Sequence, residues 1–303
     1  MKPNPLLMQL GYDKNDRVVI VHADDVGMCQ ATITAFADLV EFGTISSGAV
    51  MVPCPWFLQA AAYCRQHPNA DVGIHLTLTS EWSTYRWGPL STRDPATGLI
   101  DEEGYFHHRA HQVQKHADPQ AVQTELKAQL IRALDAGIQV THIDTHMGAL
   151  AHPKFLPIYI RLGQLYNLPA VIPADGEADW QVLGLDAQTA DKAARFVREY
   201  VNDQALLQID HFIGLRLDQP QDRFAQAKSA FDSLQPGLTH FVIHPAQDTP
   251  ELRAATPSTW ECRVGDYEVF RSEQLRAYIK DLGIKIIGYK PLQQLSSNFQ
   301  VCA

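Results

Sequence analysis

The 303-residue sequence has little of several features that often reveal a function by themselves. Its five cysteines form no CxxC pair and are too scattered for a disulfide framework, so we expect reduced thiols and a cytoplasmic protein. No segment approaches the ~18 uninterrupted apolar residues of a membrane span, and the apolar patch near the start is too short for a signal-peptide core. We therefore expect neither membrane insertion nor export.

Positive charge is also in deficit, because 25 Lys and Arg stand against 34 Asp and Glu, for a formal net charge of −9. A chain without a basic stripe is a poor partner for nucleic acid, whose phosphates are bound by clustered Lys and Arg. The glycine-rich GxGxxG and P-loop patterns are missing as well, which removes the commonest reason to expect an open, doubly wound sheet. We expect no nucleic-acid partner.

Short apolar runs, rich in Val and Ile, alternate with amphipathic segments along the chain. Such runs, bounded by Gly, Pro or Asp, are typical of buried parallel strands. Between them, Asp118 and Ser272 are expected helix caps, with Gly137 and Gly283 as the matching stops. The alternation predicts an α/β fold, a single-domain distorted (β/α) barrel of about seven to eight strands covering residues 1–303. The predicted strands are Val18–His22, Ile45–Val52, Val72–Leu78, Val140–Asp144, Ala170–Ile172, Leu207–Ile213, His240–His244 and Lys285–Gly288.

One long segment, Thr79–Asp118, does not fit the alternation and forms an insert after the third strand. It is rich in aromatic residues, arginines and turn formers, without a sustained period. A loop of this length in a compact domain usually serves as a lid or a substrate wall, and a solvated insertion is the alternative. Four of the thirteen histidines lie in it, and we expect them to face solvent: His107, His108, His111 and His116.

Polar residues mark the ends of four predicted strands, where the core should be apolar. In a β/α barrel the active site collects side chains from the carboxyl ends of the strands. One carboxylate and two imidazoles form a set that holds a metal and leaves positions open for water and substrate. Asp25, His75 and His146 could supply this set, with His142 as an alternative ligand, because spacing alone does not decide between the histidines. The four blocks are His22-Ala23-Asp24-Asp25-Val26-Gly27, Gly73-Ile74-His75-Leu76-Thr77, Thr141-His142-Ile143-Asp144-Thr145-His146 and His244-Pro245.

Asp24 and Asp25 are neighbours, and neighbouring side chains of a regular strand point to opposite faces. Both can reach one site only if the strand breaks there, and Gly27 makes such a break plausible. The alternative is that one of the two aspartates caps the following helix.

The four blocks, in this order, resemble the YdjC-like (ChbG/HpnK type) carbohydrate deacetylase family. The resemblance runs from the first strand to about Leu292, and four ordered motifs are far more specific than any one of them. In that family the first Asp of the pair is the catalytic base and the second binds the metal. The resemblance therefore implies that Asp24 is the base and Asp25 a metal ligand.

The same matching implies that His75 and His146 are the other metal ligands and that His244 is the catalytic general acid. Two departures concern the surroundings rather than the ligands. Met147–Ala151 stand where many members carry further histidines, and Ala246 replaces the glycine of the usual His-Pro-Gly. These departures leave the metal chemistry intact and bear on substrate identity.

The resemblance implies a metal-dependent hydrolase that removes an N-acetyl group from an amino sugar or N-acetylated oligosaccharide. One divalent ion (Zn²⁺, Mg²⁺ or Co²⁺) would activate a water, with Asp24 as base and His244 as acid. Arg86 and Trp87 of the insert are candidates for substrate binding, although packing of the insert would explain them equally. A homodimer is expected from the family alone.

Two alternatives stay open at this point. One is another barrel metalloenzyme acting on sugars, an isomerase or a hydrolase of a different bond, and the other is a non-catalytic sugar-binding relative. Further polar residues near strand ends or in late loops could line the pocket, but core salt bridges explain them equally and they are left out of the catalytic set: Asp175, Asp210, His211 and Arg263.

Overall fold

Seven parallel strands form one sheet in the computed structural model, which describes residues 4–174, 177–201 and 207–300. In space they lie in the order β4-β3-β2-β1-β6-β5, and β7 pairs with the beginning of β1. The predicted α/β class is therefore confirmed, while Asp175 lies outside the described residues. The strands are β1 (Arg17–Val26), β2 (Ser47–Val50), β3 (Val72–Leu76), β4 (Val140–Thr145), β5 (His211–Gly214), β6 (Gly237–Ile243) and β7 (Lys285–Ile286).

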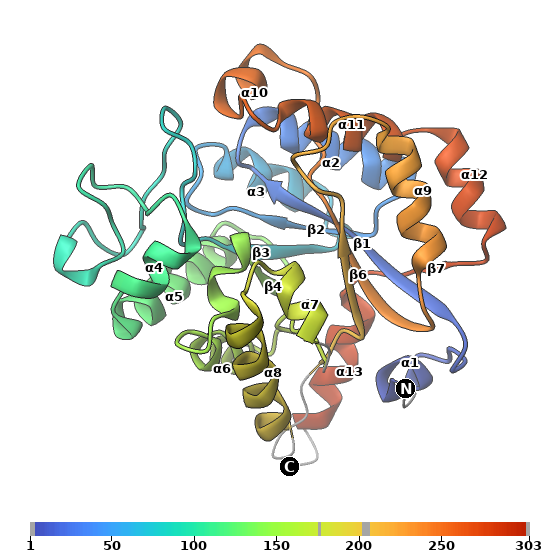
Figure 1. Ribbon diagram of the computed structural model, residues 1–303, viewed down its shortest axis with the longest axis horizontal. Coiled ribbons are helices and arrows are strands. Elements are labelled where there is room, and N and C mark those ends of the chain that lie inside the picture. Colours follow the sequence, from blue (N-terminus) through green and yellow to red (C-terminus); the bar gives the residue numbers. More distant parts are fainter. Residues whose placement is uncertain (1–3, 175–176, 202–206, 301–303) are drawn as a thin grey trace.

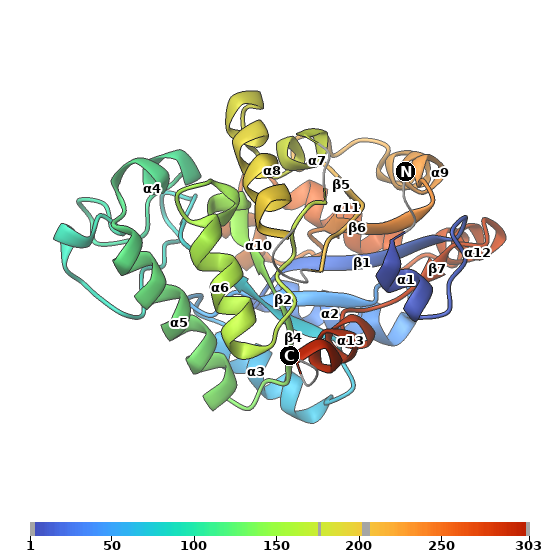
Figure 2. The same ribbon diagram turned by 90° about the horizontal axis from the view of Figure 1, so that it is seen from below.

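Helices surround the strands in both views (Figures 1 and 2). Asp118 and Ser272 cap α5 and α12 through their side chains, as the sequence predicts. Within the described residues, no helix combines the length and the apolar character that a membrane crossing requires. The helices are α1 (Pro5–Gln9), α2 (Gln30–Phe42), α3 (Phe57–Gln66), α4 (Ala110–His116), α5 (Pro119–Asp135), α6 (Leu156–Tyr166), α7 (Glu177–Val182), α8 (Ala187–Val201), α9 (Arg223–Ser233), α10 (Pro250–Ala255), α11 (Trp260–Phe270), α12 (Glu273–Asp281) and α13 (Lys290–Gln300), with 3₁₀ turns η1 (Pro95–Thr97) and η2 (His146–Ala151).

The two edges of the sheet, β4 and β5, differ from the sequence prediction. The predicted strand Ala170–Ile172 makes an isolated bridge to β4 instead of a regular ladder, because Pro169 and Pro173 on either side have no N–H to donate. The predicted strand Leu207–Ile213 likewise reduces to β5 with one isolated bridge at Ile209. Among the described residues the edges are thus connected by isolated bridges and not by a further regular strand.

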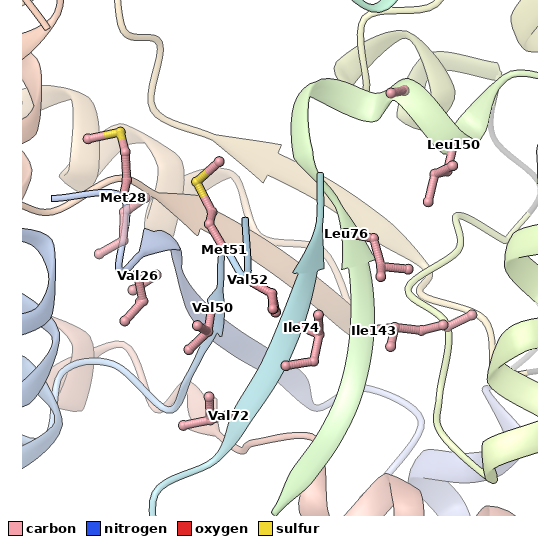
Figure 3. Packing of buried hydrophobic residues seen from close by; sticks show 14 of the residues in the cluster. Val26, Met28, Val50, Met51, Val52, Val72, Ile74, Leu76, Ile143 and Leu150 are labelled. Carbon is pink, nitrogen blue, oxygen red and sulfur yellow. The ribbon is translucent and has the colours of Figure 1, made fainter. Parts of the chain in front are cut away.

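Strand β3 shows how the packing positions the site. Val72, Ile74 and Leu76 belong to the main apolar cluster under the helices (Figure 3). His75 lies between Ile74 and Leu76, so the alternation of a strand turns it to the opposite face of the sheet. Burial of the three apolar side chains therefore fixes the direction of the histidine.

Strand β1 distributes its side chains in the same way. Val19 and Val21 join the main cluster, whereas Val18 and Ile20 join a smaller one with Tyr289 of the last loop. His22 continues the register of Val18 and Ile20, so the interior face of β1 is apolar at its beginning and polar at its end. The polar residues of this interior gather at the carboxyl edge of the sheet.

The insert, residues 79–118, projects from one end of the molecule beside α5 (Figure 1). It contains η1 and α4 and packs apolar side chains of its own, since Leu99 and Phe106 are fully buried. The insert is consequently an ordered wall next to the carboxyl ends of β3 and β4.

Candidate metal centre and active site

The strand break that Asp24 and Asp25 require is present at Asp25 itself. Its φ of 62° is left-handed, and the pairing of β1 with β2 shifts register between Ala23 and Val26. Asp is one of the few residues that tolerate this conformation, and Gly27 (φ 86°) continues the turn. Both carboxylates therefore reach the same cluster, and the predicted break is confirmed.

Asp25, His75 and His146 lie together, as predicted, and their ligand atoms are all within 4.8 Å of one another. Oδ1 of Asp25 is 3.5 Å from His75 Nε2 and 3.2 Å from His146 Nδ1. The remaining ring nitrogens are held by carboxylates: Asp144 Oδ1 is 2.8 Å from His75 Nδ1, and Glu81 Oε1 is 2.8 Å from His146 Nε2. Such outer partners fix a ring so that its free nitrogen faces a metal.

The donor set fits a divalent cation. Among the described residues, Oδ1 of Asp25 has no hydrogen-bond partner although it is buried, which is rare and costly for a carboxylate oxygen unless a cation binds there. Burial alone would lower the pKa of His146, but Glu81 and Asp25 raise it to about 9. The negative charge that attracts a proton to this position also attracts a metal ion.

Two other groups have similar spacing, His22–His142–Asp144 and Asp24–His75–Asp144. Their atoms are already bonded to one another, since His22 Nε2 is 2.9 Å from His142 Nε2 and Asp144 holds His75. The unpartnered oxygen of Asp25 therefore distinguishes its group from these two. His142, which the sequence leaves open as an alternative ligand, faces His22 instead.

Asp24 lies beside the three-residue group, with one oxygen hydrogen-bonded to His22 and the other near His75. Its Oδ1 accepts a hydrogen bond from His22 Nδ1 at 2.7 Å, while Oδ2 is 3.7 Å from His75 Nε2. Burial would raise the pKa of Asp24, but the charge of His75 and the hydrogen bond from His22 hold it well below its usual range. Asp24 is therefore an ionised acceptor.

His244 follows the end of β6, with Nε2 3.8 Å from Asp24 Oδ2. Its backbone N–H donates to Asp266, whose carboxylate is paired with the buried Arg223. Burial lowers the pKa of His244, and its Nδ1 has no hydrogen-bond partner within the part of the chain that the structure describes. The structure thus brings together all five residues of the predicted catalytic and metal-binding set.

Comparison with known proteins identifies a family over most of the chain. The sequence profile of the family described as YdjC-like protein matches residues 18–281. A carbohydrate deacetylase of Thermus thermophilus is 32% identical over 276 residues, which are 91% of this chain and 94% of that protein. The chain belongs to the YdjC-like family.

Two more relatives extend the comparison. A carbohydrate deacetylase of Thermoanaerobacter pseudethanolicus is 24% identical over 277 residues, covering 91% of the YdjC-like chain described here and 100% of that protein. A solved structure from Enterococcus faecalis, proposed to be a cellobiose-phosphate cleavage protein, matches with a TM-score of 0.71 at 22% identity, over 91% of this chain and 99% of that one. This last likeness supports the fold alone.

Two residues contact the predicted ligands although the sequence analysis does not include them in the set. Arg263 places Nη1 2.8 Å from Asp25 Oδ2, so it is both part of a core salt bridge and a neighbour of the site. Glu81, at the start of the insert, binds His146. A buried arginine needs a carboxylate partner, and this requirement was the available signal for Arg263 in α11. The sequence around Glu81 carries no comparable signal.

Arg86 and Trp87 both serve the packing of the insert. Arg86 donates to Asp101 at 2.6 Å and to the carbonyl of Phe106 at 2.7 Å. The indole of Trp87 is buried, and its Nε1 donates to the carbonyl of Thr79 at 2.8 Å. Their placement adds no observation in favour of the expected contact with substrate.

The four histidines of the insert differ in their exposure to solvent. His111 and His116 are exposed, and His108 is half-buried. The expectation of solvent exposure is wrong for His107, which is buried against the insert backbone and shares a hydrogen bond with the carbonyl of Gly98 at 3.0 Å.

Proposed function

We propose that this YdjC-like protein is a metal-dependent carbohydrate deacetylase that hydrolyses the N-acetyl group of an amino sugar or N-acetylated oligosaccharide. The observation that carries the proposal is the unpartnered Oδ1 of Asp25, which faces two imidazole nitrogens beside the carboxylate of Asp24. The names of the curated relatives supply the carbohydrate and the acetyl group.

Asp25, His75 and His146 would hold one divalent ion, Zn²⁺, Mg²⁺ or Co²⁺. When bound, such an ion lowers the pKa of water from about 15.7 towards about 7 and polarises a carbonyl. Arg263 keeps the ligand carboxylate ionised, because burial would raise the pKa of Asp25 but the guanidinium holds it well below its usual range. The protein residues thus supply a fixed, negatively charged cradle.

The proton steps belong to Asp24 and His244. As water attacks the acetyl carbonyl, Asp24 Oδ2 accepts the water proton, since its Oδ1 is occupied by His22. His244 is largely neutral at neutral pH because its pKa is lowered, so it must receive a proton before donating one. The 3.8 Å between Asp24 Oδ2 and His244 Nε2 is longer than a hydrogen bond, so this proton would pass through one bridging water. His244 would then protonate the amine nitrogen as the C–N bond breaks. The products are acetate and the free amino sugar.

Acetate release tests the proposal. Chelated protein is supplied with Zn²⁺, Mg²⁺ or Co²⁺ and assayed against a panel of N-acetylated mono- and oligosaccharides, with the unsupplemented protein as control. The proposal expects acetate only with an added ion and an N-acetylated sugar. Saccharide binding without acetate would identify a non-catalytic relative instead, and a product other than acetate would identify a different sugar metalloenzyme.

We also propose a cytoplasmic location. The described cysteines (Cys29, Cys54, Cys64 and Cys262) are all free and buried, as in proteins of a reducing compartment. Fractionation of cells that produce the protein tests this, and recovery outside the cytoplasm would contradict it.

A further inference from the structure

A continuous chain of buried polar contacts leads from Asp24 on β1, through residues of β4, to Asp71 just before β3. His22 Nδ1 is 2.7 Å from Asp24 Oδ1, and its Nε2 is 2.9 Å from His142 Nε2. His142 Nδ1 is 2.9 Å from the hydroxyl of Thr141, which is 2.8 Å from Asp71 Oδ1. We call these five residues the buried chain. Four of them, all except Asp24, are almost inaccessible to solvent.

The number of hydrogens in the buried chain sets a constraint. Its four contacts need four hydrogens, one for each, since two lone pairs at 2.7–2.9 Å repel each other. Two neutral imidazoles and one hydroxyl supply only three, and the carboxylates at the ends supply none. The chain must therefore hold one additional proton, on the pair His22–His142, on Asp71 or on Asp24. The proposed role of Asp24 as base requires an ionised carboxylate there, which leaves the pair His22–His142 and Asp71.

The surroundings of Asp71 favour the carboxyl group. Oδ2 accepts the backbone N–H of Lys290 at 2.7 Å, and the Ser47 hydroxyl lies 3.0 Å from Oδ1. These partners are neutral, and the imidazole nitrogen His142 Nδ1 is 3.8 Å from Oδ1. Burial raises the pKa of Asp71, and the hydrogen bonds from Lys290, Thr141 and Ser47 offset that rise only in part. A protonated Oδ1 would still accept from Ser47 and donate to Thr141.

The surroundings of His22 and His142 disfavour placing the additional proton on either imidazole. The ring of His142 stacks on Tyr289 at 3.9 Å, and burial together with His22 and His240 lowers its pKa well below the usual value. His22 faces Asp24 on β1, Asp144 on β4 at 3.8 Å and the ring of His240 on β6 at 4.8 Å. The negative charges of Asp24 and Asp144 therefore act on other histidines as well as on His22, which weakens their stabilisation of a proton there.

We propose that Asp71 is a neutral carboxylic acid and that its proton sets the direction of every hydrogen bond in the buried chain. Asp71 donates to Thr141, Thr141 donates to His142 Nδ1, and His142 Nε2–H donates to His22 Nε2. His22 then carries its only proton on Nδ1 and must donate it to Asp24 Oδ1. The buried chain thereby acts as a positioning device that leaves Oδ2 as the only basic oxygen of Asp24.

Infrared and ¹⁵N NMR spectroscopy test the protonation without any substrate. At pH 8 we expect a carboxylic-acid C=O absorption that is lost in Asp71→Asn and kept in Asp218→Asn, which alters an exposed ion pair. The NMR spectra should show His142 protonated only at Nε2 and His22 only at Nδ1. A band that is absent or survives Asp71→Asn, or double protonation of His22 or His142, would overturn the proposal.

The positioning role rests on the proposed function and has its own test. Thr141→Val keeps the shape of the side chain and removes the hydroxyl, so kcat for acetate release should fall roughly tenfold at unchanged KM and metal content. Thr141→Ser restores the hydroxyl and should recover the rate. Equal kcat in both variants would refute positioning, whereas a wild-type protein without acetate release but with the expected spectra would refute only the proposed function.

Discussion

Arg263 Nη1 lies 2.8 Å from Asp25 Oδ2, and both side chains are almost completely buried. Asp25 therefore divides its two oxygens, one neutralised by the guanidinium and the other facing His75 and His146. Because an arginine does not lose its proton in a protein, this contact keeps Asp25 ionised and fixes the direction of its free oxygen.

Replacement of Arg263 should consequently weaken metal binding. Arg263→Met is expected to lower metal affinity about 10- to 100-fold, as loss of a group that orients a ligand usually does, with Arg263→Lys intermediate. Titration calorimetry with the chelated protein measures the effect. The control is Arg216→Met, which removes an exposed ion pair. Wild-type affinity in folded Arg263→Met would contradict the role of this residue.

Metal binding should stabilise the fold through Asp25 and His75. A ligand at 100 times its Kd adds about 2.7 kcal/mol to the free energy of unfolding, so the melting temperature should rise when ions are added to chelated protein. Asp25→Ala and His75→Ala should lose this response. His111→Ala, at an exposed position, should keep it. An undiminished response in both site variants would place the ion elsewhere.

Asp24→Asn and His244→Ala should each reduce kcat about 10²- to 10⁴-fold while folding and metal content survive. The two losses can be distinguished with an O-acetyl ester of the same sugar, whose alkoxide leaves more easily than an amide anion. His244→Ala should then recover much of its rate, whereas Asp24→Asn should not. Equal losses on the ester and the amide would argue against His244 as the acid.

Acid should destabilise the protein through His240. Burial and the neighbouring His22 lower the pKa of His240 well below 6.5, so the unfolded chain binds its proton first as the pH falls. The contribution is complete above about pH 6.5 and is lost progressively below it, towards the lower folded-state pKa. Urea unfolding at pH 7.5 and 5.5 should show a smaller loss in His240→Gln than in wild type. His111→Gln serves as the exposed control.

Arg86 should stabilise the insert and contribute little to substrate affinity. Its bonds to Asp101, Glu103 and the carbonyl of Phe106 are internal to the insert, so Arg86→Met should increase proteolytic cleavage within residues 79–118. Arg93→Met, at an exposed position of the same insert, is the control. A large rise in KM with an intact insert would instead support the sequence-based assignment to substrate binding.

The residues of the site that the sequence predicts are those marked by a pattern among their immediate neighbours. His75 could be placed because its apolar neighbours alternate, and Asp25 because a paired aspartate before a glycine predicts a strand break. The isolated bridges at Ala170 and Ile209 were harder to predict, because Pro169 precedes Ala170 and Pro173 is the bridge partner of Ile209, and prolines shorten strand pairing.

The unpredicted part depends on contacts between distant segments. Arg263 lies on α11 and Glu81 at the start of the insert, and only the folded chain brings them to Asp25 and His146. His107 was misassigned for the same reason, because a polar stretch of sequence gave no sign that its own backbone would cover this ring.

The contact between Glu81 and His146 is a hydrogen bond that joins the insert to the candidate metal centre. Thermodynamic reciprocity then requires that any saccharide that orders the start of the insert and tightens this bond also tightens the ion, by the same factor by which the ion favours the saccharide. Cation and sugar would thus be cooperative ligands of one protein even without touching each other.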